Sequence, residues 1–321
     1  YTHQPIANEF FVKSHTLLFE QGVYDFEICV ENWAGIPAFF KTNKVSKIPY
    51  DIFASTFYLI SRYEEFLPYI KDSIGSFKYS NSIAYKNGFL EKPIVDLWAI
   101  KLLEKINEFF PDLVNFPSKK PIFTPLISVV NPYKYKEKYF LFNFLDSLDF
   151  IWKLDFFNLI DQFLVIFGFK KDPYDNLQQL RDLFVKNKIK PKYFFLFAQN
   201  NYYDRGLSNK NYSYKKLIKD IADYEWVSLL VSYAGQNQSL KLLDEKKNMM
   251  NLIYKKIKSI RFNYGLLSSS TSYNELINQE IQNDFSMGYN EETGYRASTA
   301  VPFYFYDLNI ESQTPLKLYP V

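Results

Sequence analysis

Tyr193-Phe194-Phe195-Leu196-Phe197 and Val227-Ser228-Leu229-Leu230-Val231 are the two stretches that decide the fold of this chain. Each is a short and almost wholly apolar run, which is typical of a strand that is buried on both faces. Helical patterns precede, separate and follow them, over residues 177–187, 214–224 and 240–256. Strands that alternate with helices indicate parallel pairing. The sequence therefore predicts an α/β fold.

The same alternation continues on both sides of these stretches. Ile127-Ser128-Val129-Val130 predicts an earlier strand, and a further strand is expected near Ile260, followed by a helix over residues 273–279. In α/β barrels and related folds, functional sites form at the carboxyl ends of the strands. The residues directly after each strand are therefore the first candidates for a site.

The first part of the chain has a different pattern. Residues 1–50 predict short strands, because Leu17-Leu18-Phe19 is hydrophobic and residues 24–28 alternate between apolar and polar side chains. Helices are expected over residues 51–66, where Asp51 can cap the first turn, and over residues 94–110.

A proline-rich stretch separates the two patterns. Pro111, Pro117 and Pro121 occur within one short segment that also contains Lys119 and Lys120. A chain of 321 residues favours two domains. We therefore predict an N-terminal α/β domain over residues 1–115 and a second domain over residues 116–321.

Composition excludes several classes of protein. The chain has 38 basic and 35 acidic residues and a net charge of +3, which is no electrostatic footprint for nucleic acid. No stretch reaches the roughly 18 apolar residues of a transmembrane helix. The best candidate, residues 156–169, contains polar residues and predicts an amphipathic or buried helix. The chain begins with Tyr1, so it says nothing about a signal peptide.

The single cysteine and the high aromatic content are also informative. Cys29 excludes an internal disulfide and lies in an apolar, strand-like context, which predicts a buried thiol. It fits a reducing compartment, and a cytoplasmic location is the weak expectation. Aromatic residues make up 20% of the chain. This content reflects either an AT-rich genome or a groove whose rings stack on sugars.

Several segments occur in an order that is informative as a set. They are Lys171-Asp172-Pro173-Tyr174-Asp175, residues 190–196, residues 283–289, Gly294-Tyr295-Arg296-Ala297 and residues 301–308. In order and spacing they resemble the bacterial polysaccharide deacetylase-like proteins of surface-polysaccharide gene clusters. Residues 49–68 resemble the domain that precedes the deacetylase domain in that group. The resemblance covers roughly residues 45–321 and implies an irregular (β/α) barrel preceded by a small α/β domain.

The resemblance also implies a mechanism. In this family a divalent metal, often zinc, is held by an aspartate and two histidines, activates water and polarises an acetamido carbonyl. A second aspartate acts as the general base, and a histidine protonates the leaving amine. Each of these roles requires a side chain that binds metal or carries a proton.

This chain has other residue types at those positions. The residues that replace the two carboxylates and three histidines are Ser128, Val130, Leu230, Asn263 and Tyr319. Realignment does not restore the site, because the only histidines are His3 and His15. The spacing of Asp175, Asp204 and Asp284 does not indicate a site for a hard cation. We therefore expect no metal and no other cofactor.

Other residues of the family pattern are retained. Arg261 and Asp284 match positions that orient catalytic groups, and we expect them to lie near each other. They form either a buried ion pair or part of a pocket that still binds a polar, sugar-like ligand. The candidate ligand-binding residues are Tyr133, Tyr233, Arg261, Asn263, Asp284, Arg296 and Tyr319.

These observations leave three functions open. The first is a catalytically inactive deacetylase homologue that acts as a carbohydrate-binding or scaffold component in surface-polysaccharide biology. The second is an active N-deacetylase or other hydrolase whose site is rebuilt around Arg261, Asn263, Asp284 and Tyr319. The third is a structural subunit of a larger assembly. The expected partner is thus a glycan or a protein.

Overall fold

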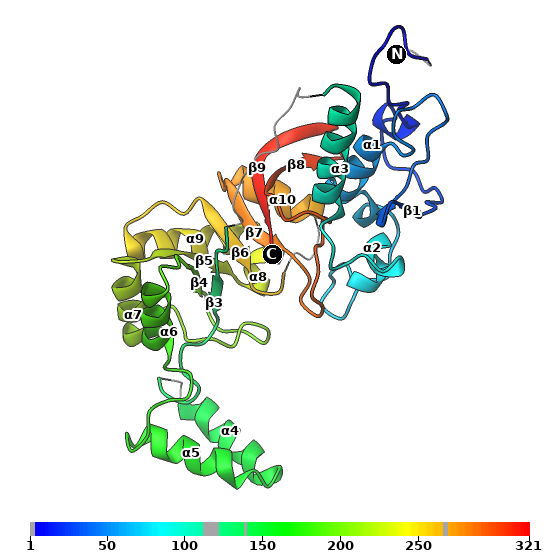
Figure 1. Ribbon diagram of the computed structural model, residues 1–321. Helices are drawn as coiled ribbons and strands as arrows, with labels where there is room; N and C mark the ends of the chain where they lie inside the picture. The colour runs from blue at the N-terminus through cyan, green and yellow to red at the C-terminus, as the bar shows by residue number, and fades with distance from the viewer. Residues whose placement is uncertain (1–3, 112–121, 138–139, 266–268) are drawn as a thin grey trace. The chain divides into compact units, whose positions relative to one another are not determined.

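The computed structural model describes residues 4–111, 122–137, 140–265 and 269–321. The chain forms two compact units, one from residues 1–120 and 264–321 and the other from residues 121–263 (Figure 1). Both units contain strands and helices, which confirms the predicted α/β class. Among the helices of the described residues, none combines the length and the apolar character needed to cross a bilayer.

Four parallel strands form the centre of the unit made by residues 121–263. They are β3 (Leu126–Val129), β4 (Lys192–Leu196), β5 (Trp226–Val231) and β6 (Ser259–Phe262). They pair in chain order, and Phe194 of β4 lies in register with Ser128 of β3 and Ser228 of β5. The helices are α4 (Phe140–Trp152), α5 (Phe156–Ile166), α6 (Leu177–Lys186), α7 (Tyr212–Ala222), α8 (Tyr233–Asn237) and α9 (Ser239–Ile253).

Burial explains why these strands form where they were predicted. Phe194, Phe195 and Leu229 have no exposed surface, so the apolar runs are covered on both faces. Helices α7 and α9 pack against β5 and against each other. The Tyr214 hydroxyl of α7 donates a 2.8 Å hydrogen bond to the carbonyl of Leu196, which ties this helix to the end of β4.

Helices α4 and α5 form an antiparallel hairpin (Figure 1). Helix α5 lies within the apolar run predicted as an amphipathic or buried helix, whereas α4 was not predicted. The base of the hairpin is held by Asp172, whose carboxylate accepts hydrogen bonds from the backbone N–H groups of Lys134, Tyr135 and Lys136. Burial raises the pKa of Asp172, but these donors outweigh it and leave the pKa below its ordinary value.

The other unit combines residues from both ends of the chain. Its strands are β1 (Glu31–Trp33), β2 (Ile36–Ala38), β7 (Asn283–Met287), β8 (Phe303–Asp307) and β9 (Ser312–Pro320). Its helices are η1 (Thr16–Leu18), α1 (Ile52–Ile60), η2 (Tyr63–Glu65), η3 (Tyr79–Asn81), α2 (Ile83–Lys86), α3 (Ile94–Phe109) and α10 (Ser269–Asn278). Strand β9 pairs parallel with β7 and antiparallel with β8. The core surrounds Trp98 of α3, whose indole N–H donates to the Pro37 carbonyl.

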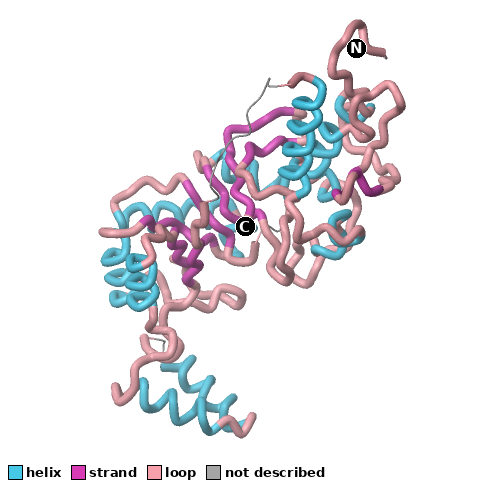
Figure 2. Tube along the Cα trace, viewed as in Figure 1, coloured by secondary structure: helices cyan, strands magenta, loops and turns pink. Residues whose placement is uncertain are grey.

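The N-terminal predictions are partly wrong. Residues 4–50 are mostly loop (Figure 2), and Leu17 and Leu18 lie in the 3-10 helix η1 instead of a strand. No strand covers residues 24–28, because the Tyr24 N–H donates to the Tyr63 hydroxyl and not to a neighbouring strand. Cys29 is exposed, so the predicted buried thiol is also wrong.

Two predicted boundaries remain to be placed. Asp51 caps α1 as predicted, but the helix ends at Ile60 because Arg62 adopts a left-handed conformation before η2 begins. The predicted domain boundary between residues 111 and 121 falls almost wholly outside the described residues. Residues 264–321, which the sequence assigned to the second domain, belong to the same compact unit as the N-terminal segment.

Candidate functional site

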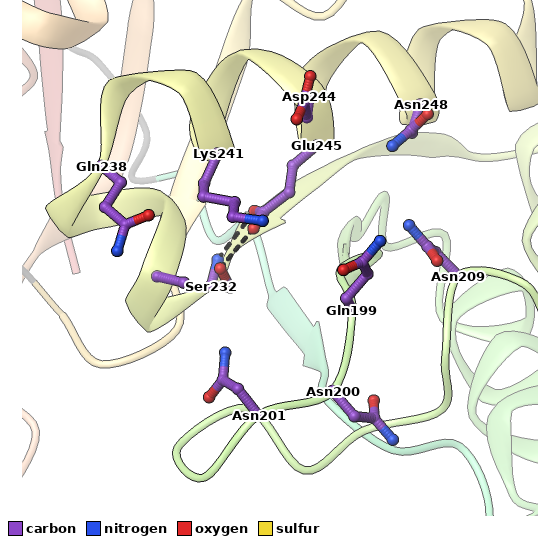
Figure 3. Close-up of a pocket in the computed structure, with 11 residues that line it drawn as sticks. Gln199, Asn200, Asn201, Asn209, Ser232, Gln238, Lys241, Asp244, Glu245 and Asn248 are labelled. Atoms are coloured by element: carbon purple, nitrogen blue, oxygen red, sulfur yellow. Dashed lines mark hydrogen bonds between the residues drawn. The ribbon is translucent and has the colours of Figure 1, made fainter.

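A pocket of about 220 Å³, lined almost wholly by polar residue types, lies where β4 and β5 end (Figure 3). Two segments of the chain line it: the connection from β4 to α7, and the segment from the end of β5 to α9. The lining residues are Gln199, Asn200, Asn201, Asn209, Ser232, Ala234, Gln238, Lys241, Asp244, Glu245 and Asn248. Six of them carry a carboxamide, and we refer to this cavity as the carboxamide pocket.

The position of the pocket follows from the parallel sheet. The carboxyl ends of neighbouring parallel strands meet at one edge, so the segments after β4 and β5 lie next to each other. Gln199 follows β4, and Ser232 directly follows β5. The side chains of Lys241, Glu245 and Asn248 reach the same space from α9, as Figure 3 shows.

Glu245 is the most perturbed acid of the pocket. Its carboxylate accepts a hydrogen bond from the Ser232 backbone N–H at 3.1 Å and a short one from the Ser232 hydroxyl. Burial raises the pKa of Glu245 to about 7, the Ser232 hydrogen bonds lower it in part, and nearby Asp204 adds to the increase. Gly235 leaves room for this approach, because a Cβ atom there would lie 2.9 Å from Glu245 Oε2 and would displace the carboxylate. Glu245 can thus change its charge near neutral pH beside the pocket.

The loop after β4 is fixed by a buried aspartate. Asp204 is 1% exposed and accepts hydrogen bonds from the Tyr233 backbone N–H at 2.9 Å and from Asn201 Nδ2 at 2.8 Å. Gly206 allows the loop to approach β3, because a Cβ atom there would lie 2.6 Å from the Val130 carbonyl oxygen. The hydrogen bond from the Asn201 side chain to this buried carboxylate holds Asn201 at the pocket.

Aromatic rings occur at the same edge. The rings of Tyr203 and Tyr233 stack with their centroids 4.2 Å apart, and Tyr202 contacts Tyr203 edge-on at 5.1 Å. Tyr233 lies between Ser232 and Ala234 in the sequence, and both of these residues line the pocket. The predicted residue Tyr233 is therefore adjacent to the pocket, although it does not line it.

A second, more open cavity of about 520 Å³ adjoins the carboxamide pocket. The two share Gln199, Asn209 and Asn248. The second cavity adds the ammonium groups of three lysines and no carboxylate: Lys210, Lys215 and Lys219. Together the cavities join a carboxamide-rich region to a region of positive charge.

The other predicted residues of this unit lie outside both cavities. Ser128 is exposed on β3, whereas Leu230 on β5 is fully buried. Asn263 follows β6, where its backbone N–H donates to the Val231 carbonyl. Arg261 is half-buried on β6, and Tyr133 is half-buried, with a pKa that burial raises.

The remaining predicted residues belong to the other unit. Asp284 has no exposed surface and accepts a 2.6 Å hydrogen bond from the Ser286 hydroxyl. Tyr319 stacks on Phe285 with a centroid distance of 4.3 Å. Since Arg261 and Asp284 lie in different compact units, their pairing stays a prediction.

Arg296, the last candidate ligand-binding residue, takes part in a buried ion-pair network. Glu65 Oε1 accepts hydrogen bonds from Arg296 Nε at 2.8 Å and from Arg62 Nε at 2.9 Å. Burial alone would lower the pKa of Arg62, but neighbouring groups, Glu65 foremost, raise it above its ordinary value. This network connects the N-terminal and C-terminal segments of the unit, a structural role that the sequence did not predict.

No group of three or more His, Cys, Asp or Glu side chains could hold a metal ion within the parts of the chain that the structure describes. The residues of the carboxamide pocket were missed by sequence reasoning, which examined the positions of the family's metal ligands. The available signal was the run Gln199-Asn200-Asn201 directly after a predicted strand.

Comparisons with known proteins bear on the N-terminal segment alone. Residues 1–111 match DUF7033, a family of unknown function. No curated protein matches this chain.

Proposed function

We propose that this protein is a carbohydrate-binding relative of the polysaccharide deacetylases, without their metal-dependent catalysis, and that the carboxamide pocket is its glycan site. One observation carries the proposal: six carboxamides surround one cavity at the carboxyl ends of two parallel strands. A carboxamide offers N–H donors and a carbonyl acceptor on one side chain. This combination suits sugar hydroxyls, which also donate and accept.

The wider assignment rests on the pattern of the sequence. The irregular (β/α) barrel and the role in surface-polysaccharide biology belong to this proposal, and the order of the family-like segments supports both. The parallel strands β3 to β6, with helices between them, fit such a barrel. The apolar Val130 and Leu230 at the family's ligand positions support a binding role over a hydrolytic one, because neither side chain can coordinate a metal.

The neighbouring groups support a particular class of glycan. The stacked rings of Tyr203 and Tyr233 offer an apolar face at the strand ends, and Tyr203 is 42% exposed. Lys210, Lys215 and Lys219 supply positive charge in the adjoining cavity. A glycan that carries acidic sugars would place its hydroxyl groups among the carboxamides and its carboxylates near the lysines.

Titration calorimetry with glycans tests the proposal. The probes are acidic oligosaccharides, N-acetylated and free amino-sugar oligosaccharides, and a neutral glucan. We expect the acidic glycans to bind and Asn248→Ala to weaken binding by about 2- to 10-fold, since a neutral hydrogen bond contributes roughly 0.5–1.5 kcal/mol. Lys247→Ala is the control, because Lys247 is exposed on the same helix but does not line either cavity. The absence of heat with every glycan would refute the proposal.

Glu245 supports a second candidate, a hydrolase with a rebuilt site. A carboxyl group whose pKa is about 7 is suited to general acid–base catalysis at neutral pH. Both oxygens of Glu245 accept hydrogen bonds from Ser232, which favours the binding function. Release of acetate or reducing sugar by the wild type and not by Glu245→Gln would support this second function.

A further inference from the structure

The α4–α5 hairpin has its polar side chains inside. Between the helices, the Ser147 hydroxyl donates to Gln162 Oε1 at 2.9 Å, and Gln162 Nε2 donates to the Asn143 carbonyl at 2.7 Å. Gln162 is 1% exposed, and Asp161 beside it is 8% exposed and pairs with Lys170. An isolated surface hairpin would bury its apolar stripes in this seam.

The apolar side chains of the hairpin point outward instead. On α4 they recur at helical spacing, as Phe144, Leu145, Leu148, Ile151 and Trp152, and are 46–85% exposed. On α5 and the loops at its ends they are Leu154, Phe156, Phe157, Ile160, Phe163, Leu164, Ile166, Phe167 and Phe169, at 37–81% exposed. Fourteen large apolar side chains of one short segment are therefore accessible to solvent.

This surface is larger than a monomer normally exposes. With about half of each side chain accessible, the fourteen side chains present on the order of 1,000 Å² of apolar surface. The largest apolar patch of a typical monomer is roughly 300–600 Å². A standard protein interface buries about 800 Å² on each partner. The hairpin thus has sufficient apolar surface for a stable interface.

The charges of the hairpin decide between a membrane and a protein as the occupant. Residues 140–170 contain four aspartates and two lysines. Lys153 and Lys170 form ion pairs with Asp149 and Asp161, so neither lysine adds free positive charge. Helices that lie on membranes are rich in lysine and arginine on the polar face. Residues 140–170 lack such an excess of basic side chains.

We propose that the α4–α5 hairpin is a homodimerisation element, which packs against the same hairpin of a second copy of this chain. Two antiparallel hairpins with outward apolar stripes form a four-helix bundle when the stripes face each other. The pairing is isologous, because the same surface on both copies covers itself under two-fold symmetry. The hydrogen bonds of the Ser147–Gln162 seam keep each hairpin in one register during assembly.

The oligomeric state of the full chain tests this inference. Sedimentation velocity from low to high micromolar concentration is expected to give twice the chain mass. Leu148→Glu and Ile160→Glu place a charge on the outer stripes, where the wild-type side chains are 46% and 59% exposed. Each variant is expected to weaken dimerisation by roughly tenfold or more, as for charge at the centre of an apolar interface. Hydrogen exchange of α5 amides is expected to slow as the dimer forms.

Matched controls separate dimerisation from folding. Leu240→Glu makes the same change at a 75% exposed position on α9, away from the hairpin, and is expected to leave the dimer intact. Far-UV circular dichroism shows whether each variant keeps its helices. A monomeric wild type at every concentration would overturn the inference, as would a dimer that both stripe variants leave unchanged. Flotation of a monomeric chain with phosphatidylcholine vesicles would overturn it in favour of a lipid surface.

Discussion

Replacement of Glu245 by glutamine tests the environment of the carboxamide pocket through protein stability. The folded protein holds the pKa of Glu245 at about 7, compared with an ordinary value of 4.5. Burial is the main cause, because the ionised carboxylate loses its contact with water. Glu245→Gln keeps the shape of the side chain but removes its titration.

The sign and the size of the effect follow from proton linkage. Because the folded-state pKa is raised, the folded state binds the proton more tightly than the unfolded state does. The stabilisation that the folded state gains from this tighter proton binding is fully present below pH 4.5 and is lost as the pH rises through about 7. A shift from 4.5 to about 7 corresponds to a loss of about 3 kcal/mol across this window.

Urea unfolding of the wild type and the variant at a series of pH values measures this loss. The free energy of unfolding of the wild type is expected to fall by about 3 kcal/mol relative to Glu245→Gln between these limits, since other titrating groups cancel in the difference. Asp244→Asn is the matched control, because it makes the same carboxyl-to-amide change at an exposed residue of the same pocket. If the free energy of unfolding varied with pH in the same way for the wild type and Glu245→Gln, the reasoning would be refuted. Such a result would mean that the carboxyl group of Glu245 has the same pKa in the folded and the unfolded state.

Two further substitutions test packing. Gly206→Ala should lower the free energy of unfolding by about 1–3 kcal/mol, because the added Cβ would lie 2.6 Å from the backbone oxygen of Val130. An unchanged midpoint of urea unfolding would contradict this close approach. Glu65→Ala should lower the free energy of unfolding by about 3–5 kcal/mol, because it leaves Arg62 and Arg296 buried without their shared carboxylate, and Glu65→Gln should lower it less. An alanine variant that unfolds at the same temperature as the wild type would argue against the network.

The strands and helices of residues 121–263 were largely predictable because local pattern and tertiary environment agree there. The runs that became β4 and β5 are almost wholly apolar, and nearly all their residues are buried, on both faces of each strand. Helix α9 was likewise predicted within a few residues of its bounds. In such a segment the period of the sequence reports directly on burial.

The N-terminal region shows where this agreement fails. Residues 24–28 alternate as a strand would, but Tyr24 is 57% exposed, and its backbone N–H bonds to a tyrosine hydroxyl. Alternation predicts a strand only when a neighbouring strand is available to accept its hydrogen bonds. Strands β7, β8 and β9 were missed as strands for a different reason, because their residues were interpreted as family motifs and not by their period.

The candidate site was predictable in location but not in composition. A parallel sheet brings the ends of β4 and β5 to one edge whatever residues follow them, so the polar segments after these two strands meet there. What that edge can bind then depends on the loops and on α9, which supply Gln199, Asn248 and Glu245. No single motif marks these residues, because Gln199 comes from the loop after β4 and the other two come from α9, a separate part of the sequence. The strands therefore fix where a site can form, whereas the loops and α9 decide what that site can bind.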